Sequence, residues 1–120
     1  TVEKLEHAIK EIPKIKEEFF ENLNIPQATN TMNQELEKAG RVLDYIELAE
    51  LMCRDALARN ESCGSHFREE FKTEQGDPAR NDAQFAHIAC WKTQGEKKEP
   101  KRFSEDLNFE YCKPSNRNYR

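Results

Sequence analysis

The sequence has few apolar residues and no long run of them. Hydrophobic residues make up 36% of its 120 positions and charged residues 35%, and the mean hydropathy is -1.02. No stretch approaches the roughly 18 apolar residues that a membrane-spanning helix requires. So little apolar material excludes a large hydrophobic core, and we expect a domain that is marginally stable alone or that depends on a partner.

Glycine and cysteine are also scarce. The glycines are too scattered for a phosphate-binding loop or a dinucleotide fingerprint. The cysteines are few for a disulfide framework, and no signal-peptide pattern opens the chain, so we expect free thiols and a cytoplasmic location. The glycines are Gly40, Gly64, Gly76 and Gly95, and the cysteines are Cys53, Cys63, Cys90 and Cys112.

Clustered positive charge is absent as well. The formal net charge is -4 and glutamate interrupts each basic run, which argues against a nucleic-acid partner. The sequence opens at Thr1 directly within a helical pattern, with no cap and no preceding turn that the pattern reveals. We therefore expect a fragment of a longer protein.

A first long helix is predicted between Val2 and Leu23. Apolar residues recur there every three or four positions, which places them on one face of a helix. Pro13 lies inside this pattern and predicts a kink or a new helical start. The apolar positions are Leu5, Ile9, Ile12, Ile15, Phe19 and Leu23.

A second helix is predicted from a capping box formed by Thr31 and Gln34 to about Arg59. Its apolar residues form two stripes, which indicates burial against more than one neighbour. Because the sequence supplies only one other long helix, we expect a missing partner surface, either a helix before Thr1 or another domain. The first stripe is Leu36, Ala39, Leu43, Ile46 and Cys53, and the second stripe is Val42, Tyr45, Leu48, Met52 and Ala56.

The rest of the chain is rich in turn-forming residues. The segment EQGDPARND, residues 74–82, predicts a compact loop. Two runs with aromatic and β-branched residues, 84–91 and 107–112, predict the strands of an antiparallel ribbon. A polar loop at 92–106 is predicted to separate them. A ribbon of two strands is unstable alone, so we expect it to pack on the helices.

Two pairs of cysteine and histidine suggest a metal site. The spacings Cys63-x-x-His66 and His87-x-x-Cys90 could supply two thiolates and two imidazoles to a tetrahedral zinc ion. The chain would then be an independent zinc-stabilised protein-interaction module. Against zinc, positions 87 and 90 lie in a predicted strand and point to opposite faces. The simpler interpretation is two ordinary buried thiols and two hydrogen-bonded imidazoles.

Cys63 beside His66 could also be a nucleophile and its base. A helix C-terminus precedes this cysteine, however, and its negative dipole end opposes a thiolate. Gly64 favours a structural interpretation, in which a left-handed residue closes the helix as in a Schellman turn. Arg59 and Arg68 flank this helix end, where cations are favoured.

Three segments carry a pattern when they are taken together: NQELEKAGRVLDYIELAELMCRDALARNESCGSHFREEF, ARNDAQFAHIACW and the ending NRNYR. They resemble the C-terminal region of the succinate dehydrogenase and fumarate reductase flavoproteins, and the resemblance extends over essentially the whole chain. The positions that match the family pattern are Ala56, Leu57, Ala58, Arg59, Glu61, Ser62, Gly64, His66, Arg68, Arg80, Asp82, Phe85, Arg117 and Tyr119. The departures from it are Cys63, Glu70, Asn81 and Gln84.

The resemblance implies a parent flavoprotein that interconverts succinate and fumarate through FAD and passes electrons to an iron-sulfur subunit and quinone. FAD-binding and capping domains would lie upstream of this chain, a membrane cytochrome b subunit would belong to the complex, and the chain itself would hold no cofactor. The variant ESCGSHFREE resembles the branch found in three-subunit bacterial complexes. A parent bound peripherally at the cytoplasmic face of the bacterial inner membrane is therefore implied.

The expected fold is mainly α. Long antiparallel helices of a spectrin-repeat-like bundle, whose first helix is missing, occupy 1–62, and a loop-rich tail with the two-stranded ribbon occupies 63–120. We expect the fragment to be inactive alone, to self-associate weakly through the second stripe, and to contain no catalytic, cofactor-binding or metal residue. The expected structural and docking residues are Arg59, Glu61, Ser62, Gly64, His66, Arg68, Arg80 and Asp82.

Overall fold

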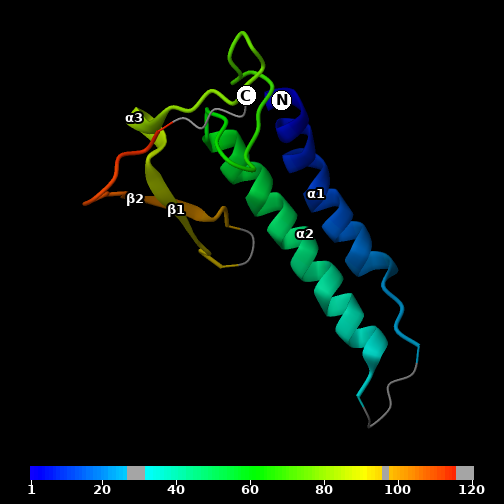
Figure 1. Cartoon of the computed structure of the whole chain (residues 1–120). Coiled ribbons are helices and arrows are strands. Elements are labelled where there is room, and N and C mark those ends of the chain that lie inside the picture. Colours follow the sequence, from blue (N-terminus) through cyan, green and yellow to red (C-terminus); the bar gives the residue numbers. More distant parts are fainter. Residues whose placement is uncertain (27–31, 96–97, 116–120) are drawn as a thin grey trace. The chain divides into compact units, whose positions relative to one another are not determined.

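A computed structural model describes residues 1–26, 32–95 and 98–115 (Figure 1). The chain divides into two compact units, Thr1–Ala58 and Arg59–Arg120. The described residues form two long helices, one short helix and a ribbon of two strands, so the predicted fold class is confirmed. None of these helices is long and apolar enough to cross a membrane.

The first unit is a hairpin of two helices, α1 (Val2–Asn22) and α2 (Gln34–Ala58), which lie side by side (Figure 1). An ion pair connects them, with Lys16 Nζ 2.6 Å from Glu47 Oε1. The apolar seam is thin, because no hydrophobic side chain in the described part of the chain is fully buried. The half-buried apolar residues include Leu5, Ile9, Ile12 and Phe19 of α1 and Leu43 and Ile46 of α2.

The start of α1 differs from the sequence prediction. The hydroxyl of Thr1 accepts a hydrogen bond from Lys4 N at 3.4 Å, so the prediction of a helix without a cap is wrong. The helix continues through Pro13, so of the two alternatives predicted there, a kink or a new helical start, the new start does not occur. A proline removes one intrahelical hydrogen bond. Apolar contacts along the helix are the main source of helical stability in proteins and offset that loss.

A side chain caps α2 as well. Asn33 Oδ1 accepts hydrogen bonds from the backbone N–H groups of Glu35 at 3.0 Å and Leu36 at 3.3 Å. These are two of the N–H groups that have no partner within the helix. The predicted cap residue, Thr31, lies outside the described residues.

The two predicted stripes of α2 differ in burial. The first stripe is half-buried except for Leu36, which is 58% exposed. Four residues of the second stripe are exposed, and only Ala56 is half-buried. The hairpin therefore covers one apolar face of α2 and leaves another in contact with solvent. The exposed fractions in the second stripe are 45% for Val42, 64% for Tyr45, 52% for Leu48 and 63% for Met52.

The second unit contains a short helix, α3 (Asp82–Phe85), and an antiparallel ribbon of β1 (His87–Lys92) and β2 (Lys101–Asp106). The first strand was predicted at 84–91 and begins three residues later, because α3 occupies the start of that run. The second strand was predicted at 107–112, and this is wrong. It lies instead within the segment predicted as a polar loop.

The position of β2 follows from pairing and not from apolar content. Its sequence, KRFSED, is polar, and its register with β1 runs from Lys92 opposite Lys101 to His87 opposite Asp106. Backbone hydrogen bonds to a neighbouring strand can hold such residues extended whatever their intrinsic preference. The apolar run at 107–112 is largely exposed, with exposed fractions of 39% at Leu107 and 91% at Tyr111.

The cap of α2 generates a stability prediction. Replacing Asn33→Ala removes the only acceptor in that side chain, and we expect the free energy of unfolding to fall by about 1 kcal/mol. Thermal unfolding followed by far-ultraviolet circular dichroism measures the change. The matched control Asn33→Asp keeps an oxygen acceptor and should unfold near the temperature of the unaltered chain. Equal unfolding temperatures for the alanine and aspartate variants would contradict the assignment of Asn33 as the cap.

Candidate functional site: a buried polar corner

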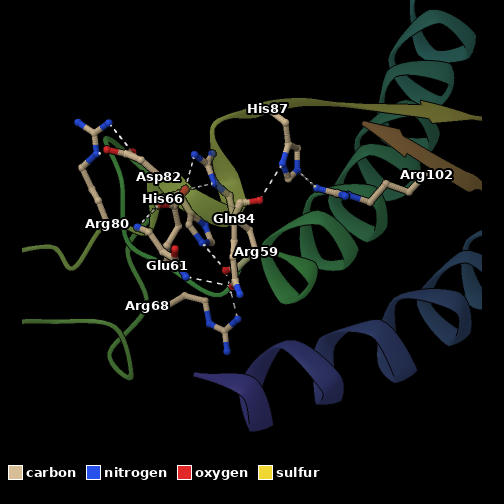
Figure 2. A network of polar contacts seen from close by, with 10 residues as sticks. Arg59, Glu61, His66, Arg68, Arg80, Asp82, Gln84, His87 and Arg102 are labelled. Carbon is tan, nitrogen blue, oxygen red and sulfur yellow. Dashed lines mark hydrogen bonds and ion pairs between the residues drawn. The ribbon is translucent and has the colours of Figure 1, made fainter. Parts of the chain in front are cut away.

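The most buried residues in the described part of the chain are polar. Glu61, Ser62 and Arg68 retain 1%, 0% and 2% of their exposed area. We call these three residues, together with Arg59 and His66, the polar corner. Figure 2 labels its four charged or ring-bearing members, Arg59, Glu61, His66 and Arg68. Buried polar groups are costly unless each has a partner, so the local hydrogen bonds decide whether this arrangement is stable.

The carboxylate of Glu61 is bonded through both of its oxygens. Oε1 accepts from Arg59, with distances of 2.7 Å to Nε and 2.6 Å to Nη2, and Oε2 accepts from the backbone N–H of Asn81 at 2.8 Å. Charge-assisted hydrogen bonds of this kind are stronger than neutral ones. One buried side chain thus joins two stretches of backbone that are 20 residues apart in sequence.

Ser62 forms hydrogen bonds through both its hydroxyl and its backbone N–H. Its hydroxyl accepts from Arg68 N at 2.9 Å and donates to Arg68 O at 3.1 Å, while its own N–H donates to Ala79 O at 2.9 Å. A hydroxyl can donate once and accept, so this serine uses both abilities on a single residue. The loops around residues 62, 68 and 79 are therefore tied together at one small side chain.

A tight turn occupies the space between Ser62 and Arg68. Cys63 N donates to His66 O at 2.8 Å, and His66 N donates to Cys63 O at 3.1 Å. Gly64, at the first inner position, has φ +60°, a left-handed conformation that glycine adopts without strain. The predicted left-handed glycine is confirmed, but its predicted role as the cap of the helix is wrong, because α2 ends at Ala58 and Gly64 belongs to this turn.

An imidazole and a guanidinium group both approach the carbonyl oxygen of Arg59. His66 Nε2 donates to it at 3.0 Å, and Arg68 Nη1 lies 3.4 Å away (Figure 2). The same Nη1 donates to Asn60 Oδ1 at 3.0 Å. Arg68 also lies 4.9 Å above the ring of Phe71, so its guanidinium has both polar and aromatic neighbours. The residue that follows α2 is thus fixed by donors from the returning loop.

Arg80 and Asp82 form a second pair beside the corner. Arg80 donates to Asp82 Oδ1 from Nε at 3.1 Å and from Nη2 at 2.7 Å, and its Nη1 donates to Ser115 O at 2.9 Å. The hydrogen bond to the Asp82 carboxylate raises the pKa of Arg80, which favours the charged form of its guanidinium. Arg80 therefore ties the C-terminal tail to the loop before α3.

The structure brings most of the predicted structural residues together. Arg59, Glu61, Ser62, His66 and Arg68 form one hydrogen-bonded group, and Arg80 and Asp82 pair beside it. Sequence reasoning missed the contributions of Ala79 and Asn81. Both act through the backbone: Asn81 donates its N–H and Ala79 accepts at its carbonyl oxygen. Every residue has a backbone carbonyl and every residue except proline has an N–H, so the side chains at these positions gave no sign of the contacts. The docking role of these residues stays a prediction.

The four residues of the proposed zinc site are not brought together. Among the described residues, no group of three histidine, cysteine or acidic side chains could hold a metal ion. His66 donates to a carbonyl oxygen and His87 is bonded at both ring nitrogens. Cys90 is exposed while His87 is half-buried, as expected for opposite faces of a strand. The zinc-stabilised module is therefore not supported.

The interpretation of Cys63 and His66 as nucleophile and base is also not supported. The Nε2 atom of His66 carries a hydrogen, because its partner, the Arg59 carbonyl oxygen, can only accept. That nitrogen therefore cannot take a proton from a thiol. The hydrogen bonds between Cys63 and His66 run between their backbones and hold a turn.

Comparison with known proteins identifies a family for the whole chain. A family model described as the fumarate reductase flavoprotein C-terminal region matches residues 1–119. No curated protein and no solved structure matches the chain. The ending NRNYR, which carries Arg117 and Tyr119, lies outside the described residues.

Removal of the Glu61 carboxylate should destabilise the second unit. We expect Glu61→Ala to lower its free energy of unfolding by about 3 kcal/mol, since loss of one partner of a buried ion pair leaves the other uncompensated. The value is at the low end of the usual range because Arg59 is 31% exposed and can regain water. The single tryptophan, Trp91 in β1, reports the unfolding of this unit by fluorescence during denaturant titration.

Two control variants separate burial from charge. Glu61→Gln keeps one oxygen acceptor and should cost less than Glu61→Ala. Glu69→Gln removes an exposed carboxylate that pairs with Lys72 at 2.8 Å, and it should change stability by at most about 0.5 kcal/mol. If Glu61→Ala were as mild as Glu69→Gln, the corner would not hold the unit.

Proposed function

Because this chain belongs to the family of fumarate reductase flavoprotein C-terminal regions, we propose that it is a structural and docking segment of such a flavoprotein. The segment would contribute packing and leave the chemistry to other parts of the polypeptide. The observation that supports this role is the polar corner, in which the buried Glu61, Ser62 and Arg68 are used for internal hydrogen bonds.

The proposed parent interconverts succinate and fumarate. In this proposal, upstream FAD-binding and capping domains hold the flavin and the dicarboxylate, and electrons pass to an iron-sulfur subunit and then to quinone. A membrane cytochrome b subunit completes the complex at the cytoplasmic face of the bacterial inner membrane. The family match supports the flavoprotein part of this proposal, and the remaining parts follow from the sequence resemblance.

The fragment itself is proposed to be inactive. Catalysis of hydride transfer to a flavin requires groups that touch the flavin or the substrate. In the polar corner the ionisable side chains are bonded to one another, to the backbone or to the Asn60 side chain, which suits a rigid joint better than a reaction centre. The isolated chain should neither bind FAD nor oxidise succinate.

A test in the full flavoprotein distinguishes a joint from a catalytic site. We expect Glu61→Ala in the full polypeptide to lower the amount of soluble, flavin-loaded protein, while the turnover of succinate per bound FAD stays within about twofold of the unaltered enzyme. Absorbance of the bound flavin and steady-state oxidation of succinate measure the two quantities. A loss of turnover per flavin of tenfold or more, with flavin content unchanged, would contradict the structural role.

A matched variant strengthens the test. Glu69→Gln changes the same type of side chain at an exposed position of the same unit, so it should affect neither quantity. Tight FAD binding or succinate oxidation by the 120-residue chain alone would show that chemistry resides in the fragment.

The exposed stripe on α2 predicts weak self-association of the isolated chain. Exposed apolar faces of this kind usually lie against another surface in the complete protein. Sedimentation velocity at increasing micromolar concentrations should show a monomer in equilibrium with a larger species. Tyr45→Lys, at a residue that is 64% exposed, should shift the equilibrium to monomer without loss of helix. A strictly monomeric, cooperatively folded chain over the same concentrations would refute this prediction.

A further inference from the structure

The imidazole of His87 is bonded at both ring nitrogens. Nδ1 lies 3.1 Å from the carbonyl oxygen of Gln84, and Nε2 lies 3.0 Å from Arg102 Nη2 (Figure 2). A carbonyl oxygen can only accept and a guanidinium can only donate. The ring must therefore carry its hydrogen on Nδ1 and accept at Nε2, which is one tautomer of the neutral form.

The partners of His87 come from different parts of the ribbon. In the antiparallel register His87 lies opposite Asp106, and Arg102 lies opposite Trp91, near the end where the connecting loop joins the strands. Residues that alternate along paired strands share a face, so His87, Arg102 and Asp106 are on the same face of the ribbon. The side chain of Arg102 reaches along this face from the loop end toward the first residue of β1.

Two charged residues share the face of the ribbon on which His87 lies. Within the ribbon the charged residues that share its face are Arg102 and Asp106, both from β2. From α3, the neutral groups against the ring are the Gln84 carbonyl and the Phe85 ring, whose centroid lies 5.9 Å away, while Asp82 is engaged with Arg80. Arg102 is thus the cation that a protonated ring would repel, and Asp106 is the carboxylate that would attract it.

We propose that His87 and Arg102 form a proton-controlled latch on the ribbon. The neutral ring accepts from Arg102 and holds its guanidinium across the face. Addition of a proton at Nε2 turns that atom from an acceptor into a donor, so the hydrogen bond is lost and two cations oppose each other. The bond from Nδ1–H to Gln84 is retained in both forms. Arg102 is released from the ring, and Asp106 becomes the partner of the imidazolium.

The latch lies outside the role proposed for the polar corner and does not depend on it. Histidine side chains in proteins commonly change charge between about pH 5 and pH 8. A change of charge at His87 would change the position of one cation on the ribbon.

Nuclear magnetic resonance of the full 120-residue chain tests the latch directly. Near pH 8 the ring nitrogen shifts of His87 should show the Nδ1–H tautomer, and rotation of the Arg102 guanidinium should be slow. As the pH is lowered and the ring protonates, that rotation should become at least about threefold faster. An Nε2–H tautomer near pH 8, or a guanidinium rotation rate that does not follow the protonation of His87, would overturn the proposal.

Variants identify the group responsible. His87→Gln supplies a carboxamide oxygen that can accept from Arg102 and does not titrate, so rotation should stay slow throughout. If the rotation of the Arg102 guanidinium in this variant still became faster at low pH, as in the unaltered chain, the role of His87 would be overturned. Asp106→Asn removes the carboxylate that favours the imidazolium, so release should move to lower pH, and no movement would overturn the part assigned to Asp106. The measurements on the unaltered chain decide the proposal even if a variant fails to fold.

Discussion

The second unit depends on the burial of one carboxylate. Glu61 is almost completely removed from water, and such a charge is tolerated only when its oxygens are bonded. Arg59 satisfies one oxygen and the backbone N–H of Asn81 satisfies the other. The loop before α3 is therefore held in place by a hydrogen bond to a residue 20 positions earlier. In the same way, the hydrogen bonds of Ser62 hold the backbone at Arg68 and Ala79.

The two units are stabilised in different ways. The helical hairpin relies on a narrow seam of half-buried apolar residues, side-chain caps and surface ion pairs such as Lys16 with Glu47, which are individually weak. The second unit relies on a compact set of buried polar contacts. Since hydrogen bonds are directional, such contacts specify one geometry. The apolar seam of the hairpin, by contrast, leaves four residues of the second stripe of α2 exposed.

Periodicity was enough to predict the helices, because repeated spacing of residues such as Leu5, Ile9 and Ile12 has one simple structural solution. The ribbon was harder. The second strand was predicted at 107–112 because that run is apolar, whereas β2 is a polar segment held by its pairing with β1. The corner residues were identified through family resemblance, and their geometry could not be predicted. The partners of Glu61 and Ser62 include backbone groups of Asn81 and Ala79, which leave no trace in the side-chain sequence.

Native-state hydrogen exchange of three backbone amides tests most directly whether the polar corner holds the second unit. The N–H groups of Ser62, Arg68 and Asn81 all donate within the corner. If the corner opens only when the unit unfolds, the three amides should exchange together and with the slowest rates of residues 59–115. Exchange of these amides as fast as that of exposed loop amides, or at three unrelated rates, would contradict the account.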